Sequence, residues 1–121
     1  IGSVQLQTEK SWVMLVIGDH CDPETGAMIE GLRDPRIRYI NLPLRSGEQT
    51  TPNSVGLSVA RTPYVAFLNH DDVWFPDHLQ TAKAALDSGA DFFAGRAAFA
   101  FDPEEDDHQT APAFTEASPP G

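Results

Sequence analysis

The sequence predicts an α/β domain in which short strands alternate with helices. Three observations support this fold class. Residues 12–17 and 64–68 are apolar runs rich in strand-forming residues, each followed by signals for the start of a helix, and residues 37–42 alternate between apolar and polar side chains. Because alternation of strands and helices is typical of parallel sheets covered by helices, we expect a sandwich whose strands are mostly parallel.

The first half of the chain contains two predicted strands and a helix between them. The run 12–17 is apolar throughout, as is typical of a strand buried on both faces. Asp22 followed by Pro23 predicts a helix start, because proline is favoured at the first helical position. The predicted elements of this half are the end of a helix at 1–8, a strand at 12–17, a helix at 25–32 and a strand at 37–42.

The second half contains a strand that leads into an acidic cluster and then a helix. The strand is Tyr64–Leu68, and apolar side chains at helical spacing follow from about Pro76 to Ser88. Gly89 is placed to end that helix. The other predicted elements are a loop at 43–52, a short helix at 53–60, a strand at 91–101 and a flexible acidic, proline-containing tail at 102–121.

Composition excludes several classes of partner. The formal net charge of the 121 residues is −10, which argues against a nucleic-acid-binding or anionic membrane surface. Cys21 is the single cysteine, so an internal disulfide is excluded and a reducing, cytoplasmic location is expected. No apolar run approaches the length of a transmembrane helix. A negative protein can still bind a nucleotide when a cation lies between them.

Three polar clusters follow predicted strands: Asp19, His20 and Asp22, then Asn41 with the loop to Asn53, then 69–72. Since parallel strands end at the same edge of a sheet, these clusters can converge on one ligand. Asp22 is equally explained as a helix cap, and His20 is better explained as a turn residue than as a metal ligand. Cys21 is most simply a small packing residue.

Adjacent carboxylates at Asp71 and Asp72 point to a divalent cation. Two neighbouring carboxylates repel each other, and a cation with oxygen ligands relieves that repulsion. The alternative is that Asp72 caps a helix while Asp71 is simply exposed to solvent.

Several linked segments resemble the family 2 glycosyltransferases of the GT-A fold. Upstream, Ser3, Val4, Gln7 and Thr8 before Trp12, then VIGD at 16–19 and DPRIRY at 34–39, agree with that family in order and spacing. The segments downstream are GEQTTPNSVGL at 47–57 with Ala60, YVAFL at 64–68, HDDVW at 70–74 and PDHL at 76–79.

The resemblance implies a Rossmann-like sandwich that binds a nucleotide-diphospho-sugar and transfers its sugar, with inversion, to an acceptor. It also implies Mg²⁺ or Mn²⁺ at the acidic motif, with Asp71 as the matching metal ligand and Asp19 near the base of the donor. We therefore expect Asp19, Asn69 and His70 to contact the donor and Asp71 and Asp72 to bind the cation. That cation would stabilise the departing diphosphate.

The chain departs from the family pattern in three respects. The opening strand of the family has no counterpart, so residues 1–101 are expected to form an incomplete domain with free strand edges that promote self-association. Asn69 and Gly18 stand where many members have aspartate. The acceptor region with the general base also has no counterpart, and a missing base lowers the rate by roughly 10²–10⁴-fold.

Three functions are therefore open at the level of sequence. The first is a glycosyltransferase domain that is impaired or inactive as this isolated chain. The second is a non-catalytic module, derived from a glycosyltransferase, that binds nucleotide-sugar and metal or self-assembles. The third is an inert gene fragment.

Overall fold

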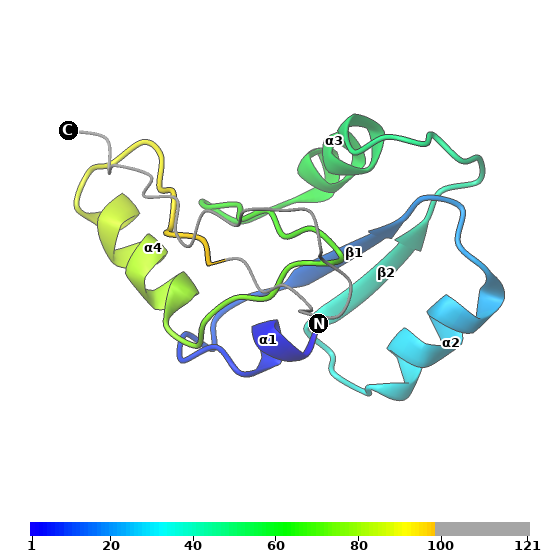
Figure 1. Ribbon diagram of the computed structural model, residues 1–121, viewed down its shortest axis with the longest axis horizontal. Helices are drawn as coiled ribbons and strands as arrows, with labels where there is room; N and C mark the ends of the chain where they lie inside the picture. Colours follow the sequence, from blue (N-terminus) through cyan, green and yellow to red (C-terminus); the bar gives the residue numbers. More distant parts are fainter. Residues whose placement is uncertain (99–121) are drawn as a thin grey trace, which may run out of the picture. The chain divides into compact units, whose positions relative to one another are not determined.

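The computed structural model describes residues 1–98. Its elements, in chain order, are α1 (Gly2–Gln5), β1 (Met14–Gly18), α2 (Pro23–Gly31), β2 (Ile37–Asn41), α3 (Thr50–Val59) and α4 (His78–Asp87) (Figure 1). These residues form two compact units. One unit comprises Lys10–Val73, and the other combines Ile1–Glu9 with the described residues from Trp74 onward. The predicted tail at 102–121 lies outside the described residues.

A parallel pair of strands is the centre of the Lys10–Val73 unit. The register runs from Met14 opposite Ile37 to Gly18 opposite Asn41. This parallel pair with its flanking helices confirms the α/β class, and it is consistent with an incomplete GT-A domain. A two-stranded sheet is marginal by itself, so the helices that cover it are needed for its stability.

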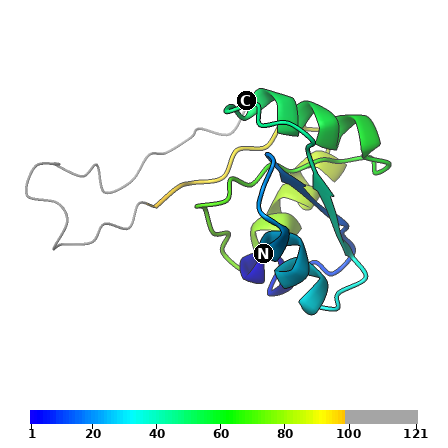
Figure 2. The same ribbon diagram turned by 90° about the vertical axis from the view of Figure 1, so that its right-hand side faces the viewer.

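Helices α2 and α3 cover opposite faces of the strand pair (Figures 1 and 2). A methyl group added at Gly26 of α2 would lie 3.2 Å from the Tyr39 ring, and one added at Gly56 of α3 would lie 3.6 Å from Ile17. Tyr39 is paired with Val16, the residue before Ile17, and successive strand residues point to opposite faces. The two close helix–sheet contacts are therefore on different sides of the sheet.

The ends of the helices largely follow their sequence signals. Pro23 is the first residue of α2, with Asp22 in extended conformation before it, although the Asp22 side chain makes no capping hydrogen bond. Helix α4 ends just before Gly89, whose φ of 108° is in the left-handed region that glycine favours. Helix α3 begins at Thr50, three residues earlier than predicted, because the proline at position 52 is tolerated in its first turn.

Two strand predictions are wrong for the residues that the structure describes. Tyr64–Leu68 is not in a strand, and Tyr64, Val65 and Phe67 are 41%, 44% and 57% exposed. Residues 91–98 also lack a strand, apart from an isolated bridge at Ala97, and 99–101 lie outside the described residues. Strand preference reflects packing against neighbouring strands, and 65–68 have no backbone hydrogen bond to any described residue.

A buried glutamine holds the other unit together. The Gln7 side chain is completely buried, and its Nε2 donates to the carbonyl oxygens of Phe75, at 2.7 Å, and Ser3, at 3.0 Å. Its Oε1 accepts from the backbone N–H of Leu79, at 2.9 Å, in the first turn of α4. Gln7 thus satisfies an N–H group that the helix leaves unpaired, from a position 72 residues away in sequence.

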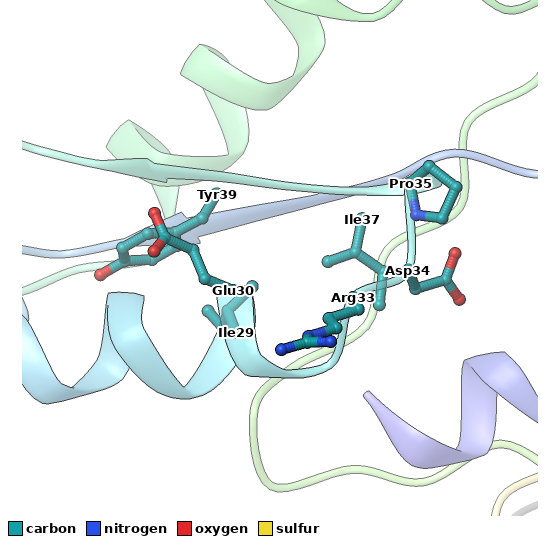
Figure 3. Close-up of a pocket in the computed structure, with 7 residues that line it drawn as sticks. All are labelled: Ile29, Glu30, Arg33, Asp34, Pro35, Ile37 and Tyr39. Atoms are coloured by element: carbon teal, nitrogen blue, oxygen red, sulfur yellow. The ribbon is translucent and has the colours of Figure 1, made fainter.

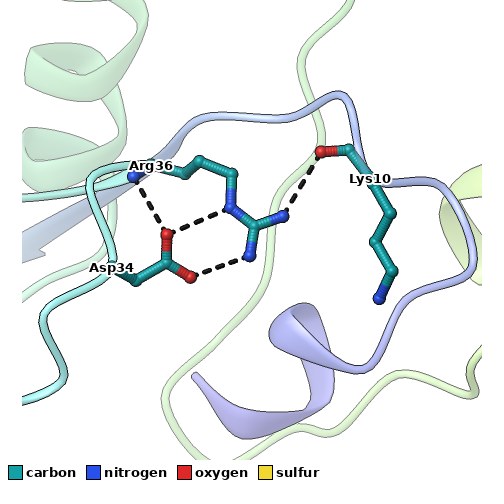
Figure 4. Close-up of polar contacts among 3 residues, drawn as sticks. All are labelled: Lys10, Asp34 and Arg36. Carbon is teal, nitrogen blue, oxygen red and sulfur yellow. Dashed lines mark hydrogen bonds and ion pairs between the residues drawn. The ribbon is translucent and has the colours of Figure 1, made fainter.

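An arginine connects the beginnings of β1 and β2 (Figure 4). The Arg36 guanidinium forms an ion pair with Asp34, at 2.8 Å, and donates to the Lys10 carbonyl oxygen, at 3.3 Å. It also lies 3.8 Å from the centre of the Trp12 ring, at a distance typical of a cation–π contact. The hydrogen bond to Asp34 raises the Arg36 pKa. These contacts hold together the N-terminal ends of β1 and β2. Gly18 and Asn41 lie at the other end of the sheet.

Gly18 is required by close packing at the end of β1. An added Cβ would lie 2.6 Å from the Tyr39 hydroxyl oxygen and 2.8 Å from Asn41 Oδ1. Gly18 is buried, so neither side chain can move aside without disturbing its own surroundings. An aspartate at this position would meet the same obstruction.

We predict that Gly18→Ala lowers the free energy of unfolding by about 1–3 kcal/mol, because the added methyl group overfills a packed site. Gly31→Ala is the matched control, since an added Cβ at Gly31 meets no atom within 4 Å. Urea unfolding followed by circular dichroism measures both changes. Equal stabilities of wild type and Gly18→Ala would contradict the proposed packing constraint.

Candidate functional site

The candidate site is at the carboxyl edge of the β1–β2 pair. β1 ends at Gly18, directly before Asp19, and β2 ends at Asn41. This edge of a parallel sheet is where open α/β folds bind ligands. Two sets of side-chain hydrogen bonds, made by Asn41 and by Asp19, organise the turns that follow the strands.

Asn41 pairs with the backbone of the turn after β1. Its Oδ1 accepts from the Cys21 N–H, at 2.8 Å, and its Nδ2 donates to the Cys21 carbonyl oxygen, at 2.9 Å. The side-chain amide thus replaces a peptide group and continues the hydrogen bonding beyond the last strand residue. Within this turn His20 has φ of 57°, a left-handed conformation that fits its predicted role as a turn residue.

Asp19 binds the loop that follows β2. Its Oδ1 accepts from the Ser46 N–H, at 2.7 Å, and from the Ser46 hydroxyl, at 2.9 Å. Its Oδ2 accepts from the Gly47 N–H, at 2.8 Å. A carboxylate has about four acceptor positions, so roughly one remains on Oδ2 for a ligand. Asp19 therefore shapes the loop as well as offering an acceptor.

The Asp19 carboxylate is held in its charged form by these bonds. The Ser46 N–H, followed by the Gly47 N–H, lowers the pKa of Asp19, while partial burial opposes them. The positive charge of Arg45 lowers this pKa further. Asp19 is thus ionised over the physiological range.

Behind this turn, the Tyr39 hydroxyl is buried without a well-formed hydrogen bond among the described residues. Burial raises the pKa of Tyr39, and the neighbouring Cys21 side chain adds to this effect. Tyr39 therefore stays a neutral packing group. The half-buried Cys21 matches the predicted packing role.

The acidic motif forms an exposed turn. Asn69, His70, Asp71 and Asp72 are all exposed, and the Asp72 N–H donates to the Asn69 carbonyl oxygen, at 3.2 Å. Helix α4 begins at His78, so Asp72 does not cap it. No group of three or more His, Cys, Asp or Glu residues is arranged as a metal site within residues 1–98.

The structure thus joins some of the predicted site residues and not others. Asp19 and Asn41 are linked through a shared turn, whereas no hydrogen bond or ion pair connects 69–72 to them in the described region. Ser46 and Gly47 were not singled out as site residues, although both lie in the loop from Asn41 to Asn53 that was expected at this edge. The structure gives Gly47 a left-handed φ of 72°.

A separate pocket of about 370 Å³ lies at the other end of the sheet (Figure 3). It is bounded by the end of α2, the connection to β2 and the first residues of that strand. The lining residues are Ile29, Glu30, Arg33, Asp34, Pro35, Ile37 and Tyr39. Since neither Asp19 nor the acidic motif contributes to it, this pocket is not part of the candidate site.

We predict that Asp19→Asn destabilises the domain at neutral pH and that this difference disappears in acid. A carboxyl group whose pKa is lowered by folding stabilises the native state above its unfolded pKa, near 3.8, and loses this effect as the pH falls through the lower folded pKa. Unfolding at pH 2–7 measures the difference. Asp22→Asn is the control, and a pH-independent difference for Asp19→Asn would refute the linkage.

Comparisons with known proteins agree with the resemblance noted in the sequence. The chain is 32% identical over 95 residues to uncharacterized protein y4gI of Sinorhizobium fredii, covering 75% of this chain and 10% of that protein. It is 30% identical over 87 residues to the putative colanic acid biosynthesis glycosyl transferase WcaA of Escherichia coli, covering 69% and 30%. It is 33% identical over 86 residues to protein CgeD of Bacillus subtilis, covering 65% and 20%.

The chain therefore spans between a tenth and about a third of the length of these relatives. No solved structure matches it. None of the helices within residues 1–98 is both long and apolar enough to cross a bilayer. The family described as glycosyl transferase family 2 matches residues 1–119, nearly the whole sequence. The chain belongs to glycosyltransferase family 2.

Proposed function

We propose that this domain binds a nucleotide-diphospho-sugar at the carboxyl edge of its sheet and contributes to inverting sugar transfer. The main support is the combination of family membership with the Asp19 turn, which places an ionised carboxylate at the edge where α/β folds bind ligands. In this proposal the remaining acceptor position on Asp19 binds the base or ribose of the donor. Asn69 and His70 contact the donor from the acidic turn.

The cation in this proposal is Mg²⁺ or Mn²⁺, bound by Asp71 and Asp72. Both carboxylates are exposed and supply hard oxygen ligands, and neither forms an ion pair with a described residue. Mg²⁺ commonly binds one or two carboxylates and completes its coordination with water and phosphate oxygens. A two-carboxylate site therefore fits such a cation. Once bound, the cation would stabilise negative charge on the departing diphosphate.

The same proposal holds that transfer by this isolated chain is impaired. Inverting transfer needs a base that removes the proton of the acceptor hydroxyl as the new bond forms. The site residues proposed among 1–98 are all assigned to the donor or the cation, and none of them is assigned as that base. We therefore assign donor and metal binding, rather than turnover, to the described residues.

A non-catalytic, self-assembling module is the second candidate. It is favoured by residues 65–68, which combine strand-forming side chains with backbone groups that bond to no described residue. Phe67 is 57% exposed in this segment. Exposed strand-forming segments pair readily with other chains, so homo-oligomer formation remains a prediction for this segment.

We predict that Asp71→Ala weakens Mn²⁺-dependent binding of UDP or GDP by about 10–100-fold, because a charged ligand to the cation is lost. Isothermal titration calorimetry with nucleotide, in the presence and absence of Mn²⁺, measures the effect. Asp91→Ala removes an exposed carboxylate from the other unit and serves as the control. Unchanged metal-dependent binding in Asp71→Ala would exclude the proposed metal ligand.

A further inference from the structure

We propose that Asn41 is a positioning residue for the donor site, acting through the turn that carries Asp19. This inference rests on the proposed function, since it assigns to Asn41 the task of presenting Asp19 to the donor. Asn41 itself contacts no ligand in this proposal. Its contribution is to fix the backbone from which Asp19 extends.

The geometry of the Asn41 amide is specific to asparagine. The Cys21 N–H must meet an acceptor and the Cys21 carbonyl oxygen must meet a donor, and the distances are 2.8 and 2.9 Å. A carboxylate of the same shape would satisfy the N–H but place a second acceptor against the carbonyl oxygen. A shorter side chain would lose both hydrogen bonds.

The space that Asn41 occupies depends on Gly18, its partner across the strands. A Cβ at Gly18 would lie only 2.8 Å from Asn41 Oδ1. The absence of a side chain at Gly18 therefore allows the Asn41 amide to turn toward Cys21. Gly18 and Asn41 form a complementary pair, and Asp19 directly follows the first of them.

The effect of Asn41 reaches the second loop through Asp19. Asn41 fixes Cys21, two residues after Asp19, and Asp19 accepts hydrogen bonds from Ser46 and Gly47. Releasing Cys21 would widen the range of positions available to the Asp19 carboxylate. The N–H groups of Ser46 and Gly47 would then lose a fixed acceptor, and the donor would lose a preorganised contact.

The test uses Asn41→Asp, with Asn53→Asp as a control that adds the same charge on α3. The probe is UDP with Mn²⁺, measured by calorimetry from pH 8 to pH 4.5. We expect Asn41→Asp to weaken UDP binding about tenfold relative to wild type at pH 8, because one hydrogen bond is replaced by repulsion between two acceptors.

The pH profile distinguishes positioning from a general loss of folding. Protonation of the introduced Asp side chain, whose ordinary pKa of about 3.9 is raised by the facing Cys21 carbonyl oxygen, restores a donor toward that oxygen. The ratio of the two UDP dissociation constants should therefore decrease as the pH approaches 4.5. Asp19, His20, Asp22, Cys21 and Tyr39 are the titratable groups of this turn and its packing. They are present in both proteins, and comparison with wild type at each pH removes their own effect. A tenfold ratio that is the same at every pH would overturn the proposal.

Amide hydrogen exchange tests the positioning without a nucleotide. Asn41→Ala at pH 7, which removes both hydrogen bonds to Cys21, should accelerate exchange at Cys21, Ser46 and Gly47 together by about tenfold, whereas Asn53→Ala should not. Faster exchange at Cys21 alone would overturn the transmission through Asp19. If the Asn41 variant shows faster exchange at all three amides but wild type does not bind UDP, then the proposed function fails while the positioning of Asp19 stands.

Discussion

The hydrogen bonds of the Asp19 carboxylate with Ser46 and Gly47 determine the shape of the candidate site. β1 and β2 bring the two following turns to one edge of the sheet, but strand pairing alone leaves both turns free to move. Three bonds to one carboxylate connect them, and the N–H groups that form two of these bonds keep Asp19 ionised. Gly18 and Asn41 then fix the turn on which Asp19 lies. Hydrogen bonds between the two turns therefore preorganise this edge of the sheet.

The sequence was sufficient to predict the elements that have local signals. The apolar run at 12–17 predicted a strand where β1 is found, although β1 begins at Met14 and includes Gly18. The Asp22–Pro23 helix start and the glycine after α4 matched the structure. Tyr64–Leu68 failed because strand formation depends on a neighbouring strand, which its own residues do not specify. The need for glycine at position 18 could not be predicted from the sequence either. Its packing against Tyr39 and Asn41 depends on the register of the two strands.

The site residues inferred from the sequence remain predictions, and the sequence was uninformative about their contacts. Asp19 was expected to accept a hydrogen bond from a donor molecule, and most of its acceptor capacity is instead used by Ser46 and Gly47. These partners come from a loop 27 and 28 residues further along the chain, so no local pattern identifies them. Gln7 is a comparable case, because its burial follows from contacts with Phe75 and Leu79 rather than from its own polarity.

The central claim is that one nucleotide–cation ligand binds at the carboxyl edge and contacts both the Asp19 turn and the acidic turn. A titration of the ¹⁵N-labelled chain with UDP and Mg²⁺, followed by NMR, tests this claim most directly. The account predicts concentration-dependent shifts of the amide signals of Ser46, Gly47, Asp71 and Asp72 with a common dissociation constant. Shifts confined to the pocket around Arg33 and Ile37, or no shifts at any of these amides, would contradict it.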